Sequence, residues 1–271
     1  MKLLRHFFSF YINSSIHVAV AVCSFAIITA LEFGFRMDLT LFAFIFFGTI
    51  SGYNFVKYAK VAGLHHRTLT NSLKTIQVFS FVCFLAFCFF GLKLPLKILA
   101  FIAAFGLLTF FYAVPSLKRK NLRSLSRLKI FIVAVVWAGV TVIVPAISKT
   151  GSFHSDIWLT FFQRILIVIV LTLPFEIRDV RYDALSLKTF PQQIGIGKTK
   201  YLGIIFLGIS LLLETFKENF SFEYFTALLI FCVILAAVLA ISKTEQHKYF
   251  SSFWVEGLPI FWLLIYCLLL A

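Results

Sequence analysis

The chain has 271 residues, of which 61% are hydrophobic and 13% are charged, and its mean hydropathy is +0.98. These values lie outside the range of water-soluble domains, so they exclude an ordinary soluble enzyme and indicate an integral membrane protein. The formal net charge of +14 would suit a protein that binds nucleic acid, but the basic residues are spread over alternate loops, so we expect no nucleic-acid partner.

Apolar runs of about 20 residues are long enough to cross roughly 30 Å of hydrocarbon. Nine runs can be placed, which predicts an all-α membrane bundle of about nine transmembrane helices in a single domain, residues 1–271. The predicted spans are residues 14–32, 38–56, 71–91, 95–114, 129–148, 157–175, 201–214, 223–242 and 250–270.

The loops between these spans differ in charge. If the N-terminus is cytoplasmic, most of the 25 lysines and arginines lie in the cytoplasmic loops and few lie on the opposite side. This asymmetry follows the positive-inside rule, so the sequence predicts a multi-pass protein with a cytoplasmic N-terminus and a C-terminus on the opposite side.

Polar residues occur where the first predicted span begins and where the second ends. Four begin the first span: Asn13, Ser14, Ser15 and His17. They could face the helix bundle or lie among the lipid headgroups, and we expect the second. At the end of the second span, Asn54, Lys57 and Tyr58 have helical spacing, so a helix would present them on one face.

Two further groups of charges need an explanation. Lys118 and Arg119 belong to a basic cluster after the fourth span, which either contacts anionic lipid headgroups or binds an anionic substrate. Arg164 lies inside the sixth span, where a charge costs at least ~2.5–3.5 kcal/mol near the membrane centre. We expect it to form an internal pair with Glu256 of the ninth span.

The sixth span ends abruptly in charged residues. Asp179 and Asp183 are four residues apart, so a helix would place both carboxylates on one face, with Glu176 one turn earlier. Clustered carboxylates repel each other unless a cation lies between them, and Mg²⁺ commonly binds one or two carboxylates together with waters and substrate phosphates. We therefore predict a Mg²⁺ site at Asp179 and Asp183 and a substrate that carries a phosphate or diphosphate.

These features resemble the UbiA superfamily of intramembrane polyprenyltransferases, which are nine-helix bundles with two aspartate-rich cytoplasmic motifs. The strongest likeness is Asp-x-x-x-Asp at 179–183 followed by Lys-Thr-Phe-Pro at 188–191, which is similar to the family's second motif. Tyr-x-x-Pro-x-Leu-Lys at 112–118 is similar to the end of the fourth helix in the branch that includes chlorophyll synthases. Arg-Thr-Leu at 67–69 stands where the family has Asn-Arg-Pro-Leu.

The resemblance implies transfer of an isoprenoid group from a prenyl diphosphate to a lipophilic or aromatic acceptor within the membrane. Asp179 and Asp183 would be the catalytic and Mg²⁺-binding residues. Six further residues are expected to bind the diphosphate: Asn54, Lys57, Lys118, Arg119, Arg181 and Lys188. No residue identifies the acceptor, so quinone, tetrapyrrole, sugar and lipid acceptors all stay open.

The chain departs from the family in its first motif. The asparagine is present as Asn54, but the three aspartates are replaced by Phe55, Tyr58 and Ala62. Two alternative functions therefore stay open. One is a family member that has lost catalysis and binds an isoprenoid or assists a partner enzyme. The other is a secondary transporter, because charged span ends and Arg164 would suit ion coupling.

Overall fold

The computed structural model describes residues 2–62, 71–113, 128–150, 154–181 and 188–271. Every regular element within these ranges is a helix, which confirms the predicted all-α class. In chain order the elements are α1 (Lys2–Asn13), α2 (Ile16–Glu32), α3 (Leu39–Ala62), α4 (Asn71–Gly91), α5 (Leu96–Ala113), α6 (Leu128–Ala138), η2 (Gly139–Ile143), α7 (Val144–Thr150), α8 (Ser155–Asp179), α9 (Phe190–Glu214), α10 (Phe222–Ile241), η4 (Phe250–Val255) and α11 (Leu258–Leu270).

The helices account for each predicted span, although nine is an approximate count. By length and composition, seven helices of the described chain can cross a membrane, or eight if the bent pair α1 and α2 is one span. The remaining predicted span corresponds to α5, whose apolar part, Leu96–Phe111, is shorter than the others. The fold is thus that of a multi-pass integral membrane protein.

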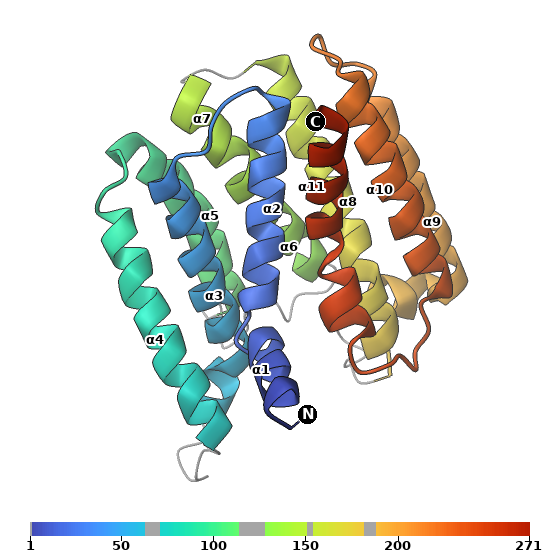
Figure 1. Ribbon diagram of the computed structural model, residues 1–271. Coiled ribbons are helices and arrows are strands. Elements are labelled where there is room, and N and C mark those ends of the chain that lie inside the picture. Colours follow the sequence, from blue (N-terminus) through green and yellow to red (C-terminus); the bar gives the residue numbers. More distant parts are fainter. Residues whose placement is uncertain (1, 63–70, 114–127, 151–153, 182–187) are drawn as a thin grey trace.

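The helices stand side by side in one bundle (Figure 1). Helix α2 contacts α3, α11 and the π-helical segment η2, while α8 contacts α6 and α9. The chain begins and ends at opposite ends of the bundle. We call the end that contains Lys57 and Asp179 the inner end, and the end that contains Glu32 and Lys217 the outer end. That the inner end faces the cytoplasm stays a prediction.

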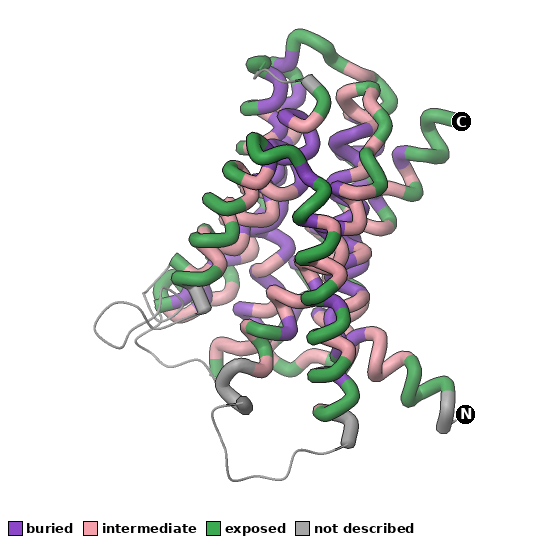
Figure 2. Tube along the Cα trace, turned by 90° about the vertical axis from the view of Figure 1, so that its left-hand side faces the viewer, coloured by how far each residue is buried: buried purple, intermediate pink, exposed green. Residues whose placement is uncertain are grey.

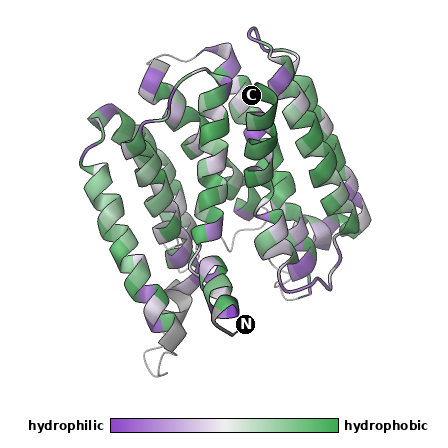
Figure 3. Ribbon diagram, in the orientation of Figure 1, coloured by the Kyte–Doolittle hydropathy of each residue, from purple (hydrophilic) through white to green (hydrophobic). Residues whose placement is uncertain are grey.

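Apolar residues cover the middle of the helices, whereas polar residues gather toward both ends (Figure 3). Buried residues are concentrated where helices face one another, and exposed residues follow the outer faces (Figure 2). The core includes Phe231 and Trp262, whose rings stack at 4.6 Å. Large apolar side chains such as Phe81 and Phe89 on α4 are exposed, as is expected of a surface that lipid covers.

The helix that enters the bundle first is broken. Ser15, between α1 and α2, has a left-handed backbone (φ 63°), and the two helices meet at 58°. The expectation that this segment lies among headgroups is wrong for Ser14, Ser15 and His17, which are buried against other helices; only Asn13 is exposed. The break carries these residues into the bundle, where the Ser15 hydroxyl donates to Asn54 and the His17 ring contacts Tyr11 and the carbonyl of Phe253. The buried Ser14 hydroxyl has no partner among the described residues.

Candidate functional site

A cavity of about 170 Å³ lies between α3, α6, α8 and the segment that joins η4 to α11. Most of its wall is apolar: Ile130, Val133, Trp137, Val168, Leu171, Phe175, Val255 and Pro259. Five polar or charged residues complete the wall: Tyr53, Lys129, Thr172, Glu176 and Glu256. An apolar cavity with a few convergent polar groups is the usual form of a small-molecule site.

Two polar contacts shape the wall on its α6 side. Lys129 Nζ lies 3.4 Å from Glu176 Oε1, so α6 and α8 are joined by an ion pair. Trp137 Nε1 donates a hydrogen bond of 2.8 Å to the hydroxyl of Tyr53, which ties α6 to α3. Both contacts hold polar atoms at fixed places beside apolar surface, so the cavity has a defined shape rather than being a gap between loosely packed helices.

Glu256 is the second carboxylate of the wall, and it corrects the predicted partner of Arg164. The charges that act on it are those of Lys57 and Arg178, both from the inner end of the bundle. Arg164 instead lies toward the outer end, where its guanidinium donates to the carbonyl of Phe25 at 3.1 Å. The pairing of Arg164 with Glu256 is therefore wrong, because the two side chains lie at different depths of the bundle.

Asn54 is buried beside the cavity wall but turned away from the cavity. Its Oδ1 accepts a hydrogen bond of 2.7 Å from Ser15 Oγ. Its Nδ2 donates to the carbonyl of Ser14 at 2.9 Å and to Ser80 Oγ at 2.8 Å. Tyr53, one residue earlier, faces the cavity, as follows from the turn of about 100° between successive helical residues. The side chain of Asn54 thus fastens the break between α1 and α2 to α3 and α4.

Lys57 and Tyr58 also join α3 to the break between α1 and α2, closer to the inner end than Asn54. Lys57 Nζ donates to the carbonyl of Asn13 at 3.2 Å, and the Tyr58 hydroxyl donates to the same oxygen at 2.9 Å. The prediction that Asn54, Lys57 and Tyr58 share a helix face is confirmed. That face holds the carbonyl groups that the helix break leaves without helical partners, at the place where the resemblance would have put the aspartate replaced by Tyr58.

The predicted acidic motif lies at the inner end of α8. Both carboxylate oxygens of Asp179 accept hydrogen bonds from Arg178, at 2.7 and 3.0 Å. Arg181 pairs with Glu245 at 2.9 Å, and both side chains are exposed. Lys188 is exposed just before α9. Three predicted site residues lie outside the described residues: Lys118, Arg119 and Asp183.

A metal site requires several ligands close together. Within the described ranges no group of three or more His, Cys, Asp or Glu side chains is placed to hold a metal ion. Asp179 offers one carboxylate at the protein surface, and its neighbour Arg178 already occupies both oxygens. Mg²⁺ at Asp179 and Asp183 therefore stays a prediction, and no chemical step is derived through it.

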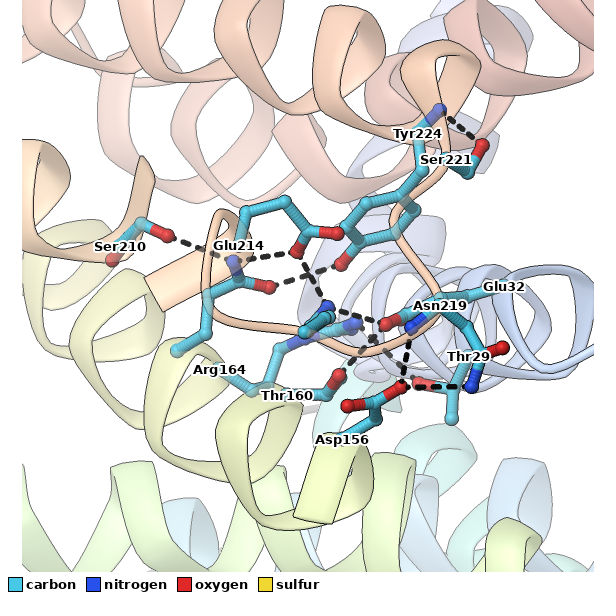
Figure 4. A network of polar contacts seen from close by, with 12 residues as sticks. Thr29, Glu32, Asp156, Thr160, Arg164, Ser210, Glu214, Asn219, Ser221 and Tyr224 are labelled. Carbon is cyan, nitrogen blue, oxygen red and sulfur yellow. Dashed lines mark hydrogen bonds and ion pairs between the residues drawn. The ribbon is translucent and has the colours of Figure 1, made fainter. Parts of the chain in front are cut away.

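A second polar cluster, which sequence reasoning missed, fills the outer end between α2, α8, α9 and α10 (Figure 4). Lys217 Nζ lies 2.5 Å from Glu32 Oε1 and 2.5 Å from Glu214 Oε2, and all three side chains are almost fully buried. Gln163 donates to Glu214 at 3.1 Å and accepts from the Tyr224 hydroxyl at 3.1 Å. We call Glu32, Gln163, Arg164, Glu214, Lys217 and Tyr224 the outer network.

Arg164 is embedded in the outer network between two rings. Its guanidinium carbon lies 4.3 Å from the ring centre of Phe25 and 5.1 Å from that of Trp262, and the negative charge of Glu32 acts on it. Cation–π contacts of this kind are strongest where water is absent. The outer network contains two cations and two carboxylates, so its formal charges balance without a ligand.

Sequence reasoning missed Tyr53, Lys129 and Glu256 as cavity residues. Lys129 is the first residue of the predicted span 129–148, and its position in the sequence does not show that its ammonium turns toward Glu176. Glu256 was singled out as buried, but depth along a helix does not reveal which neighbour a side chain faces. One signal was available, because Glu256 is an acidic residue inside an apolar run and such residues mark functional sites by default.

No model of a known protein family matches the chain, and no curated protein is significantly similar to it in sequence. Its fold is nevertheless similar to a solved structure of digeranylgeranylglyceryl phosphate synthase in membranes. The two superpose over 99% of this chain and 98% of the other with a TM-score of 0.57, at 15% sequence identity. The likeness extends over both chains from end to end, so this chain has the helical membrane fold that the UbiA resemblance predicted.

Proposed function

We propose that this protein is a membrane prenyltransferase of the UbiA type, which transfers an isoprenoid group from a prenyl diphosphate to an acceptor within the membrane. The observation that carries the proposal is an apolar cavity inside a bundle of this fold, with the cations Lys57 and Arg178 of two separate helices near enough to act on Glu256 of its wall. A molecule with an apolar tail and an anionic head matches that arrangement, since the tail is excluded from water and the head is attracted by the cations.

The residues of the two regions have different roles. The isoprenoid tail lies against the apolar wall, where Val168, Leu171 and Phe175 of α8 contact it. The diphosphate lies toward Lys57 and Arg178, whose charges already act on the inner side of the cavity. Fixed cations stabilise the negative charge that develops on a leaving diphosphate, and they act most strongly where water is excluded. Arg181 and Lys188 add positive charge at the surface of the inner end. Lys118 and Arg119 are still predicted to bind the diphosphate.

Two expectations from the sequence are modified. Asn54 is omitted from the diphosphate site, because both atoms of its amide are held by serines of the helix break and of α4. Mg²⁺ is kept as a predicted cofactor with Asp179 and Asp183 as its ligands, and when bound it would neutralise charge on the diphosphate. Asp179 must then exchange Arg178 for the metal, which costs little because this ion pair is partly solvent-exposed and ion pairs at the surface contribute only about 0–1 kcal/mol.

One observation favours the second candidate, a catalytically inactive relative that binds isoprenoids. The helix face expected to carry the first aspartate motif instead holds the break between α1 and α2 through Lys57 and Tyr58. A protein that no longer bound a metal there would be free to use that face for structure. The transporter alternative is less favoured, because the buried charges of the outer network are paired with one another and not arranged around an empty site.

The experiment uses purified protein in lipid nanodiscs with labelled farnesyl, geranylgeranyl and longer prenyl diphosphates, each with and without Mg²⁺. Release of diphosphate together with transfer of label into lipid is expected of the enzyme. Binding without release would identify the inactive relative, and an absence of binding would reject both.

Lys57→Gln provides the residue-level test of the diphosphate site. It should weaken the part of the binding that is independent of metal and sensitive to salt. Lys149→Gln, an exposed lysine at the outer end, should leave binding unchanged.

A further inference from the structure

Helix α1 belongs to none of the predicted spans, and it projects from the inner end of the bundle (Figure 2). Helix α2 alone has 17 residues, which is the lower limit for crossing the hydrocarbon layer, so α1 is not needed to complete that span. The break at Ser15 turns α1 by 58° from α2. This bend directs α1 away from the direction of the span and toward the membrane surface.

The residues of α1 form one apolar and one polar face. Four residues at intervals of three or four share the apolar face: Leu4, Phe7, Phe8 and Tyr11. Three residues at intervals of four share the opposite, polar face: Arg5, Ser9 and Asn13. The helix contains no acidic residue. An amphipathic helix with basic residues on its polar side is typical of a segment that lies in the membrane interface.

The second half of the apolar face is seated on the bundle. The ring of Phe8 contacts the rings of Tyr249 and Phe253, both at 5.1 Å. The hydroxyl of Tyr11 lies 3.0 Å from His17 Nδ1, and His17 Nε2 lies 2.9 Å from the carbonyl of Phe253. Because Phe253 belongs to η4 and His17 to α2, these contacts fix the orientation of α1 against both elements.

The first half of the apolar face is left uncovered by the described part of the chain. Leu4 is 74% exposed and Phe7 is 63% exposed. They share a face with Phe8 and Tyr11, so the surface that the bundle covers continues outward as an exposed apolar strip. Apolar surface is stabilised by removal from water. Since α1 leads directly into a helix that crosses the membrane, the apolar medium beside this strip is the acyl-chain region of the lipid.

The charge of α1 indicates which lipids it contacts. Arg5 and His6 are exposed, and the long side chain of Arg5 can reach headgroup phosphates while the apolar residues stay among the acyl chains. A basic residue beside an anionic leaflet strengthens attachment about fivefold. A second copy of the chain fits this face less well, because pairing two α1 helices would bring their basic residues together.

We propose that α1 is a surface anchor that binds anionic phospholipid at the inner end, with Leu4 and Phe7 among the acyl chains and Arg5 at the headgroups. The seated half of the anchored helix supports η4, which contributes Val255 to the cavity wall. Two consequences follow: anionic lipid gathers around α1, and its presence slows the local opening of η4.

The first test measures which lipids surround α1 in the full-length protein in nanodiscs. Cys88 and Cys267 are replaced by serine, and Leu4→Cys is labelled with a nitrobenzoxadiazole dye. At equal mole fraction, spin-labelled phosphatidylglycerol should quench the dye more strongly than spin-labelled phosphatidylcholine, with a local enrichment of about fivefold. Arg5→Gln should remove most of this enrichment. Lys198→Gln, which removes an exposed lysine on α9, is the matched control and should leave it unchanged.

Two results of this test would overturn the proposal. Equal quenching by the two lipids would show that α1 does not select anionic headgroups. Protection of the dye from both spin-labelled lipids and from aqueous iodide would show that a protein surface, such as a second copy of the chain, covers the apolar strip.

The second test measures hydrogen exchange of the η4 amides in nanodiscs of phosphatidylcholine, with and without an equal amount of phosphatidylglycerol. Exchange should be slower with phosphatidylglycerol, by up to the same fivefold. Arg5→Gln should lose this difference. Phe8→Ala should also lose it but keep the lipid enrichment, because it removes only the contact with η4. If phosphatidylglycerol does not change the exchange of η4 in the parent, the support of η4 by α1 is rejected. Neither test uses a prenyl diphosphate, so their results are independent of the proposed function.

Discussion

Lys217 is the cation on which the outer network depends, and its removal should be strongly destabilising. Its ammonium lies 2.5 Å from oxygens of both Glu32 and Glu214, so those two oxygens are at most about 5 Å apart. With an effective dielectric constant of about 20, two negative charges at that distance repel by about 3 kcal/mol. Lys217→Met leaves this repulsion and two buried, uncompensated carboxylates. Because breaking a buried ion pair typically costs about 3–5 kcal/mol, we expect a loss of that size.

A triple variant tests whether charge is the cause. Lys217→Met combined with Glu32→Gln and Glu214→Gln removes all three charges, while each new amide oxygen can still accept the hydrogen bonds now donated by Thr160 and Gln163. Since a neutral replacement of a buried ion cluster is often tolerated, most of the lost stability should return. Lys149→Met, an exposed lysine at the same end, should cost less than 1 kcal/mol.

The assay follows a thiol-reactive dye during denaturation in detergent micelles. Cys23, Cys83 and Cys232 are buried and react only on unfolding, whereas Cys88 and Cys267 are exposed and are first replaced by serine. A Lys217→Met protein that unfolds within 1 kcal/mol of the parent would refute the role of Lys217. A triple variant no more stable than the single variant would show that lost packing, not unpaired charge, is responsible.

Three further outcomes are expected. The double variant Asp179→Asn with Asp183→Asn should abolish Mg²⁺-dependent diphosphate binding, measured by calorimetry. Its melting temperature should not fall, because removing clustered carboxylates removes their mutual repulsion. Unchanged metal dependence of diphosphate binding would contradict the metal site. Gly139→Ala should destabilise by about 1–3 kcal/mol, since its methyl group would meet a phenylalanine ring 2.1 Å away, whereas Gly106→Ala has open space and should be harmless. Asn54→Leu should lower the free energy of unfolding by about 1–3 kcal/mol, because its buried hydrogen bonds are lost. Its diphosphate affinity should stay within twofold of the parent's. A loss of affinity without a loss of stability would show that Asn54 does bind the diphosphate.

The fold was predictable because it depends on properties that are summed over many residues. An apolar run of about 20 residues specifies a helix by length alone, and most helices were found where the runs predicted them. The exception is the shorter run at 201–214, which covers only the second part of α9 (Phe190–Glu214). The count was harder, because α5 has a shorter apolar part and α1 is joined to α2 by a break at Ser15. Nothing in the sequence around Ser15 distinguishes a left-handed residue from an ordinary helical one, since serine seldom adopts that conformation.

The candidate site was only partly predictable, because it depends on which way single side chains point. The spacing of Asn54, Lys57 and Tyr58 correctly predicted a shared helix face. It did not predict that this face would bind the carbonyl groups of Asn13 and Ser14. Those carbonyl groups can accept side-chain hydrogen bonds because the helix is broken at Ser15, and the sequence does not predict that break. Glu256 was recognised as a buried acid but given the wrong partner for a similar reason, because its neighbours come from helices far away in the chain.

A charge buried in a membrane protein is a candidate for function by default, yet this chain holds several, and their partners distinguish them. In the outer network Arg164 and Lys217 are matched by Glu32 and Glu214, so the cluster is neutral by itself and a bound ion would disturb its balance. At the cavity the opposite holds, because no group in the described part of the chain bonds the Glu256 carboxylate, and the cations that act on it, Lys57 and Arg178, lie toward the inner end. The same physical rule therefore assigns the first group to the stability of the fold and the second to the binding of a substrate.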